Sequence, residues 1–275
     1  MSYEVKFGLR GHDISRESLK DMVDKAEKLG VERVQFAMRV TMADIAWENG
    51  MFSYGFAKMI KQTLEEKNIS VPVLSSYVNL TDMSEREEKQ FIDTIKFASV
   101  IGAGMVGSET GRILDPDIDT HSEEAYQRVL KNVRRLVDVA EKLGVMIGIE
   151  PVSFYTIHSP ESLKRLIDDV NSPNLCVIFD LVNITTVDNY KDMKNTIEKS
   201  FELFGDRINA IHLKDISLED GKIVRKTPGE GSIDFNHYFS LLKAKKPYID
   251  IILDELPSSL YEEVSKNLIK IWDEA

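Results

Sequence analysis

The stretch from residue 142 to residue 150 reads Lys142-Leu143-Gly144-Val145-Met146-Ile147-Gly148-Ile149-Glu150, and the predicted fold rests on this pattern. Gly144 ends a helical segment, because glycine readily adopts the left-handed conformation that stops a helix. An apolar run of strand length follows, and a carboxylate closes it. The stretch therefore predicts a helix, then a buried strand, with a polar residue at the carboxyl end of that strand.

Three more apolar runs in the second half of the chain end in a polar residue. They are Leu175-Cys176-Val177-Ile178-Phe179-Asp180, Ile208-Asn209-Ala210-Ile211-His212 and Ile251-Ile252-Leu253-Asp254-Glu255. The carboxyl ends of neighbouring parallel strands meet at one edge, where α/β folds place their functional sites. We therefore expect Glu150, Asp180, His212 and Glu255 to lie close together.

The first half of the chain shows the same alternation of strand-length and helix-length segments, which is typical of a parallel sheet. Predicted strands lie at residues 5–9, 34–37, 71–75 and 105–108 and bring the total to eight strands and eight helices. No linker rich in proline, glycine or serine divides them. We predict one α/β domain over residues 1–275, a (β/α)8 TIM barrel. A doubly wound open sheet is the alternative, although no GxGxxG motif follows the first strand.

The composition narrows the class of protein further. The apolar fraction of 43% is enough for a large core, and the formal net charge of −11 argues against nucleic acid as a partner. The single cysteine, Cys176, lies in an apolar run, so we expect it in the core. No apolar run approaches ~18 residues, and the start of the chain lacks the pattern of a signal segment. We therefore expect a cytoplasmic protein with no membrane partner.

The four strand-end residues suit a metal ion. Any one carboxylate could instead make a structural salt bridge or cap a helix, but four in series favour a functional site. Three carboxylates and one imidazole suit a divalent ion, and the absence of thiolates favours a catalytic one. We expect one ion, with Mn²⁺ as the first choice and Co²⁺, Mg²⁺ or Zn²⁺ as alternatives.

Four motifs occur in an order that resembles a known family. They are Glu150-Pro151, Asp180-Leu181-Val182-Asn183, His212-Leu213-Lys214-Asp215 and Gly229-Glu230-Gly231-Ser232-Ile233-Asp234-Phe235. The chain resembles the xylose isomerase-like TIM-barrel superfamily and, within it, the sugar phosphate isomerase/epimerase group. The resemblance implies that Glu150, Asp180, His212 and Glu255 bind one divalent metal. It also implies that Glu150 and Glu255 form the acid/base pair.

The last of these positions has two candidates, because Asp254 directly precedes Glu255. Strands of a parallel sheet are apolar on both faces, so alternation alone does not separate the two acids. We prefer Glu255, which shares parity with Leu253 and leads into Leu256-Pro257, similar to the exit of the eighth strand in the family.

Four further residues are predicted to bind substrate. Many members of the resembled family have a histidine where this chain has Asn183, and an amide can bind substrate but cannot shuttle protons. Lys214 is expected to orient His212 or to contact substrate, with a surface ion pair as the alternative. Glu109 and His12 follow strands at the same rim and are expected to line the pocket, although Glu109 could instead cap a helix.

The expected function is a metal-dependent isomerase or epimerase of a sugar, sugar phosphate or polyol-derived ketone, working by proton transfer next to a carbonyl. A dehydratase of the inosose or dehydroshikimate type needs the same metal and base and is the first alternative. A DNA-repair endonuclease is disfavoured by only five histidines and the charge of −11. A non-catalytic sugar-binding barrel would be expected to have lost ligands. Family members commonly form dimers or tetramers, which implies a homodimer or homotetramer.

Overall fold

The computed structural model describes residues 5–48 and 51–275, so residues 1–4, on which part of the argument against a signal segment rested, lie outside it. Its main sheet contains eight parallel strands in the order β2-β1-β10-β7-β6-β5-β4-β3. The strands are β1 (Phe7–Arg10), β2 (Val34–Gln35), β3 (Val73–Ser75), β4 (Met105–Glu109), β5 (Ile147–Glu150), β6 (Leu175–Asp180), β7 (Ile208–Leu213) and β10 (Asp250–Leu253).

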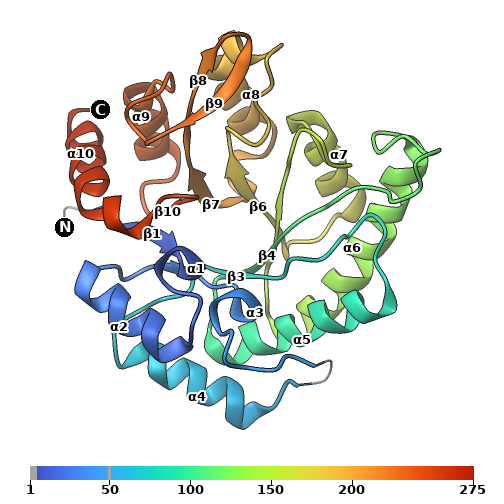
Figure 1. The fold of residues 1–275 in the computed structure, drawn as a ribbon. Helices are drawn as coiled ribbons and strands as arrows, with labels where there is room; N and C mark the ends of the chain where they lie inside the picture. Colours follow the sequence, from blue (N-terminus) through green and yellow to red (C-terminus); the bar gives the residue numbers. More distant parts are fainter. Residues whose placement is uncertain (1–4, 49–50) are drawn as a thin grey trace.

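The sheet is nearly closed into a barrel. Two isolated parallel bridges, Arg33–Ser70 and Phe36–Leu74, connect the segments around β2 and β3, which are the two ends of the strand order. Figure 1 shows the strands in the centre with the helices around them. The predicted (β/α)8 TIM barrel is therefore confirmed, and the open doubly wound sheet is wrong.

The longer helices cover the outside of the barrel, and the two four-residue helices, α1 and α3, lie near the strands (Figure 1). The helices are α1 (Gly11–Ile14), α2 (Leu19–Leu29), α3 (Met38–Thr41), α4 (Tyr54–Glu65), α5 (Glu85–Ile101), α6 (Glu123–Leu143), α7 (Pro160–Val170), α8 (Met193–Phe204), α9 (Phe235–Lys245) and α10 (Tyr261–Glu274). Three 3₁₀ turns, η1 (Tyr190–Asp192), η2 (Gly205–Arg207) and η3 (Ser258–Leu260), lie in the connections. As predicted, Gly144 stops α6 in the left-handed conformation, with φ of 65°.

The interior of the barrel is filled in layers, because alternate side chains of each strand point inward. Val73, Met105, Cys176, Ile178 and Ala210 form a buried apolar cluster there, which confirms the core position of the cysteine.

Two glycines make room for this layer. A Cβ on Gly107 would lie 2.6 Å from Ile178 Cδ1, and a Cβ on Gly148 would lie 2.5 Å from Met105 Sδ. Alternation then places Glu109, Glu150 and Asp180 two residues further along their strands, on the same inward face at the carboxyl end.

A β-hairpin that the sequence analysis did not predict follows β7. It consists of β8 (Asp215–Glu219) and β9 (Lys222–Lys226), paired antiparallel (Figure 1). Its turn is Asp220-Gly221, with φ of 47° and 73°, which is the two-residue sequence that favours a hairpin turn. This dipeptide was the signal that could have revealed the hairpin.

The buried carboxylate of Asp215 holds the following loop. Its Oδ1 accepts hydrogen bonds from the backbone N–H groups of Ile216 (2.8 Å) and Ile233 (3.2 Å). Its Oδ2 accepts from those of Gly229 (3.0 Å) and Gly231 (2.9 Å). The glycine-rich motif after the hairpin is therefore anchored to Asp215, the first residue of β8.

Candidate active site

Four polar side chains converge at the carboxyl ends of β5, β6, β7 and β10. They belong to Glu150, Asp180, His212 and Asp254, all are buried, and one ligand-type atom of each lies within 4.8 Å of the others. Asp180 and His212 are direct partners in the β6–β7 register, which explains why their side chains share one face. We call these four residues, whose side chains together could hold a metal ion, the ligand cluster.

The structure corrects the fourth position, because Asp254 lies in the ligand cluster and Glu255 does not. Ile252 is the register partner of His212, so the residue two positions after Ile252 points to the same inward face. That residue is Asp254, whose backbone N–H donates to Leu213 O at 3.1 Å. Parity with Leu253, on which we preferred Glu255, was therefore the wrong criterion.

Glu255 is turned away by the backbone. It has a left-handed φ of 59°, and its side chain is 46% exposed. Its carboxylate lies 3.3 Å from Arg225 Nε on the hairpin. Glu255 is therefore part of the rim. The acid that faces the site, Asp254, is one methylene shorter than the glutamate that the family resemblance implied.

Each carboxylate of the ligand cluster has one oxygen engaged by its surroundings. Asp180 Oδ1 accepts from the backbone N–H groups of Val182 (2.8 Å) and Asn183 (3.1 Å). Glu150 Oε1 accepts from Asn183 Nδ2 at 2.6 Å. Asp254 Oδ1 lies 2.8 Å from an Arg10 guanidinium nitrogen. One oxygen of each carboxylate is thus left to face the centre of the cluster.

The centre is filled by cationic groups. His212 Nδ1 lies 3.1 Å from Glu150 Oε2 and 3.8 Å from Asp254 Oδ2. The Lys214 ammonium lies 2.8 Å from Asp180 Oδ2 and 2.6 Å from Asp254 Oδ2. Lys214 is only 5% exposed, so the alternative of a surface ion pair is wrong.

The charges of the cluster shift its pKa values. Burial acts to lower the pKa of His212, but the charges of Glu150, Asp254 and Asp180 outweigh it and raise the pKa to about 9. Burial acts to raise the pKa of Glu150, but the charge and hydrogen bond of His212 lower it below its ordinary value. Burial raises the pKa of Asp180, whereas the Lys214 charge opposes that rise. Glu150 is therefore held ionised at neutral pH.

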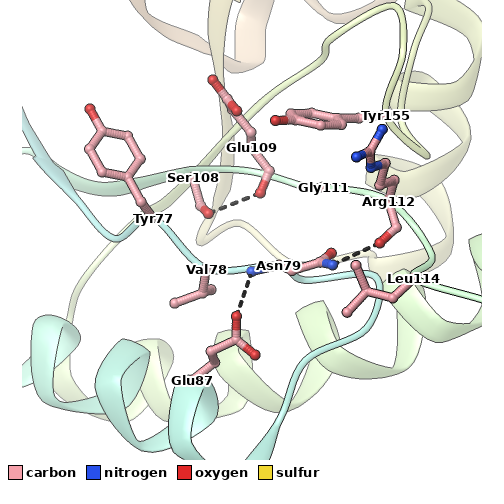
Figure 2. A pocket seen from close by; sticks show the side chains of 10 residues that line it. All are labelled: Tyr77, Val78, Asn79, Glu87, Ser108, Glu109, Gly111, Arg112, Leu114 and Tyr155. Carbon is pink, nitrogen blue, oxygen red and sulfur yellow. Dashed lines mark hydrogen bonds between the residues drawn. The ribbon is translucent and has the colours of Figure 1, made fainter.

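Glu109 lies on the neighbouring strand, as the direct register partner of Glu150. It is half-buried, and burial together with the Glu150 charge raises its pKa to about 7. It also lines a pocket of about 310 Å³ with Tyr77, Asn79, Arg112 and Tyr155. Figure 2 shows the Glu109 carboxyl group and the Tyr155 ring on the same side of the strand. The pocket is in the size range of small-molecule sites.

The other predicted residues lie around the ligand cluster. Asn183 contacts both Glu150 and Lys214, with its Oδ1 accepting from the ammonium at 3.1 Å. His12 is buried in α1, its ring is 6.2 Å from that of Tyr77, and burial lowers its pKa. No hydrogen bond or ion pair joins His12 to the ligand cluster, although the charge of Asp254 opposes the lowering of the His12 pKa. The sequence analysis did not predict a role for Arg10, which ends β1 and forms an ion pair with Asp254. Its position as a cation at the end of a strand could have indicated that it faces the site.

The protein is thus a (β/α)8 barrel with a buried polar site at the carboxyl ends of β5, β6, β7 and β10. A family model described as xylose isomerase-like TIM barrel matches residues 23–274. The chain belongs to the xylose isomerase-like TIM-barrel family. Over residues 5–48 and 51–275, no helix is long and apolar enough to cross a membrane.

Two relatives show moderate sequence similarity. “Putative L-ribulose-5-phosphate 3-epimerase SgbU” of Haemophilus influenzae is 29% identical over 156 residues, which are 55% of this chain and 52% of that protein. The match thus spans about half the length of that relative. “Uncharacterized protein MJ1311” of Methanocaldococcus jannaschii is 25% identical over 252 residues, which are 87% of this chain and 80% of that protein.

Solved structures share the fold at low identity. The 3-keto-D-glucoside 4-epimerase YcjR of E. coli has a TM-score of 0.73, with 16% identity over 97% of this chain and 99% of that one. The IOLI protein with a bound zinc atom has a TM-score of 0.70, with 19% identity over 98% of this chain and 96% of that one. The probable 3-DHS dehydratase AsbF of Bacillus anthracis has a TM-score of 0.71, with 15% identity over 98% of this chain and 99% of that one.

Proposed function

We propose that this protein is a divalent-metal-dependent isomerase or epimerase acting on a sugar, a sugar phosphate or a polyol-derived ketone. The observation that carries the proposal is the convergence of three buried carboxylates and one imidazole at the mouth of the barrel. The epimerase names among the relatives and the structural neighbours support the substrate class.

The donor set fits a divalent ion. One oxygen of each carboxylate is engaged by its surroundings, so the other oxygen is free to face the centre of the cluster. The atoms that face the centre are Glu150 Oε2, Asp180 Oδ2, Asp254 Oδ2 and His212 Nδ1. Oxygen donors with one imidazole suit Mn²⁺, our first choice, and also Co²⁺, Mg²⁺ or Zn²⁺. A bound ion supplies positive charge that polarises a carbonyl oxygen and makes the neighbouring C–H bond more acidic.

Glu150 is the proposed base. Its lowered pKa keeps it ionised, and the hydrogen bond from Asn183 fixes its orientation. Glu255, which we first paired with it, faces away. We assign the return of the proton to Glu109, because its pKa of about 7 lets it hold a proton at neutral pH. Asp254 is less suited to return the proton, since Arg10 engages its Oδ1 and its Oδ2 is one of the proposed ion donors.

The test is an assay of the Mn²⁺-loaded protein in deuterium oxide with a panel of ketoses, ketose phosphates, inososes and dehydroshikimate. We expect solvent deuterium in the product at the carbon next to the carbonyl. Glu150→Gln should lower turnover by about 10²-fold or more, whereas the control Glu255→Gln should keep it. A Glu150→Gln variant with full activity would overturn the mechanism.

A dehydratase is the second candidate. The observation in its favour is the raised pKa of Glu109, because a carboxyl group that carries a proton can protonate a leaving hydroxide. The dehydratase among the structural neighbours uses the same fold. Formation of an unsaturated product in the assay would select this function and exclude the isomerase.

A further inference from the structure

Lys214 has an unusual position for a lysine, because its charge lies inside the ligand cluster. Lys214 directly follows β7, two residues after His212, and is 5% exposed. Its ammonium contacts Asp180 Oδ2 at 2.8 Å, Asp254 Oδ2 at 2.6 Å and Asn183 Oδ1 at 3.1 Å. An ammonium group has three N–H donors, so these three acceptors satisfy it completely.

The oxygens that Lys214 engages are the ones that an ion would need. Asp180 Oδ1 is committed to the backbone N–H groups of Val182 and Asn183, and Asp254 Oδ1 is committed to Arg10. Only the Oδ2 atom of each aspartate faces the cluster, and both Oδ2 atoms contact the ammonium. An ion bound to them at about 2.0–2.3 Å would therefore lie close to a second positive charge in a buried site.

We infer that Lys214 is a built-in counter-cation of the ligand cluster, and that a divalent ion binds only when the ammonium leaves Asp180 and Asp254. The inference rests on the proposed metal site and adds how that site is regulated. Lys214 neutralises the buried carboxylates while no ion is bound, so the cluster stays ordered. Each binding event breaks these two ion pairs, which weakens the affinity for the ion.

The first test compares Mn²⁺ binding to chelator-treated protein by titration calorimetry. Lys214→Met should bind Mn²⁺ at least tenfold more tightly than the wild type, because no cation has to be displaced. Lys226→Met is the matched control: it removes a lysine of the same hairpin region whose ammonium pairs with Glu219 at 2.6 Å, away from the cluster. Its affinity should equal that of the wild type.

The same variants should differ in thermal unfolding. Without metal, Lys214→Met should have a lower Tm than Lys226→Met, because Asp180 and Asp254 lose their shared cation. Added Mn²⁺ should raise the Tm of Lys214→Met more than that of the wild type. A loss of stability that Mn²⁺ does not restore would contradict the inference.

The wild-type protein provides a test that does not depend on a variant folding. Crystal structures should show the Lys214 ammonium between Asp180 and Asp254 without metal, and beyond hydrogen-bond distance of both with Mn²⁺ bound. Mn²⁺ bound with the ammonium still on both aspartates would overturn the inference.

The outcomes also separate this inference from the proposed function. Equal or weaker affinity of Lys214→Met, with a wild type that binds Mn²⁺, would overturn the counter-cation role and leave the metal site standing. Folded wild-type and Lys214→Met proteins that both fail to bind Mn²⁺ would overturn the metal site itself, and the counter-cation role with it.

Discussion

The amide nitrogen of Asn183 donates a hydrogen bond of 2.6 Å to Oε1 of Glu150. This bond joins the loop after β6 to the end of β5 and leaves Oε2 of Glu150 directed at His212. Asn183 stands where many members of the resembled family have histidine, and it orients the proposed base without being able to titrate. The residue therefore connects the ligand cluster to the proposed proton transfer.

Replacement of this amide should impair catalysis while leaving the fold intact. We expect Asn183→Ala to lower kcat by about tenfold or more, since groups that orient a ligand or base typically contribute this much. The control is Asn189→Ala, which removes an amide that bonds only within its own loop, to Ile184 O and Thr186 N. Steady-state kinetics with the best substrate of the panel gives the comparison, and equal kcat values for the two variants would refute the role of Asn183.

The second prediction concerns the anchor of the glycine-rich loop. Asp215→Asn replaces one acceptor oxygen by an NH₂ group, and in either orientation this group faces two of the four backbone N–H groups that donate to Asp215. We expect the free energy of unfolding to fall by about 2–4 kcal/mol, because buried hydrogen bonds are lost and donors face each other.

Asp234→Asn is the control for this measurement. Asp234 caps α9 by accepting from the His237 N–H at 3.0 Å, and asparagine caps helices about equally well. Urea unfolding should show little change for Asp234→Asn. A similar small change for Asp215→Asn would show that the anchor does not stabilise the fold.

The third prediction is a pH dependence of the metal-free protein. The pKa of His212 is raised to about 9 in the folded state, against an ordinary value of 6.5. The folded state therefore holds the proton more tightly, and this contribution is complete below about pH 6.5 and lost as the pH rises through about 9. The pKa difference corresponds to stability on the order of 3 kcal/mol.

Urea unfolding in the presence of a chelator at pH 6 and pH 9.5 measures this loss. The wild type should be less stable at the higher pH, and His212→Asn should show a smaller change, because asparagine does not titrate in this range. An equal pH dependence in both proteins would rule out His212 as its source.

Much of the site could be predicted because strand ends are visible in the sequence. Glu150 and Asp180 each close a continuous apolar run, and His212 closes a run that only Asn209 interrupts. The alternation of such runs with amphipathic segments predicts a barrel in which these ends meet. The order of the strands in the main sheet then follows the chain order, with the β8–β9 hairpin inserted between β7 and β10.

The remaining features depend on contacts that the local sequence does not contain. The choice between Asp254 and Glu255 follows from the register of β10 against β7 and from the left-handed backbone at Glu255. The Arg10–Asp254 ion pair joins opposite ends of the chain, which become neighbours only when the barrel closes. The position of Lys214 inside the cluster likewise requires the three-dimensional arrangement of its acceptors.

The central claim is that Glu150, Asp180, His212 and Asp254 hold one divalent ion. Titration of chelator-treated protein with Mn²⁺, comparing Asp254→Asn with Glu255→Gln, tests it most directly, because the two acids are adjacent in sequence and only one faces the cluster. We predict that the wild type and Glu255→Gln each bind one ion with equal affinity. Asp254→Asn should bind the ion with an affinity lower by about 10-fold or more. Unchanged binding by Asp254→Asn, or no binding by the wild type, would contradict the account.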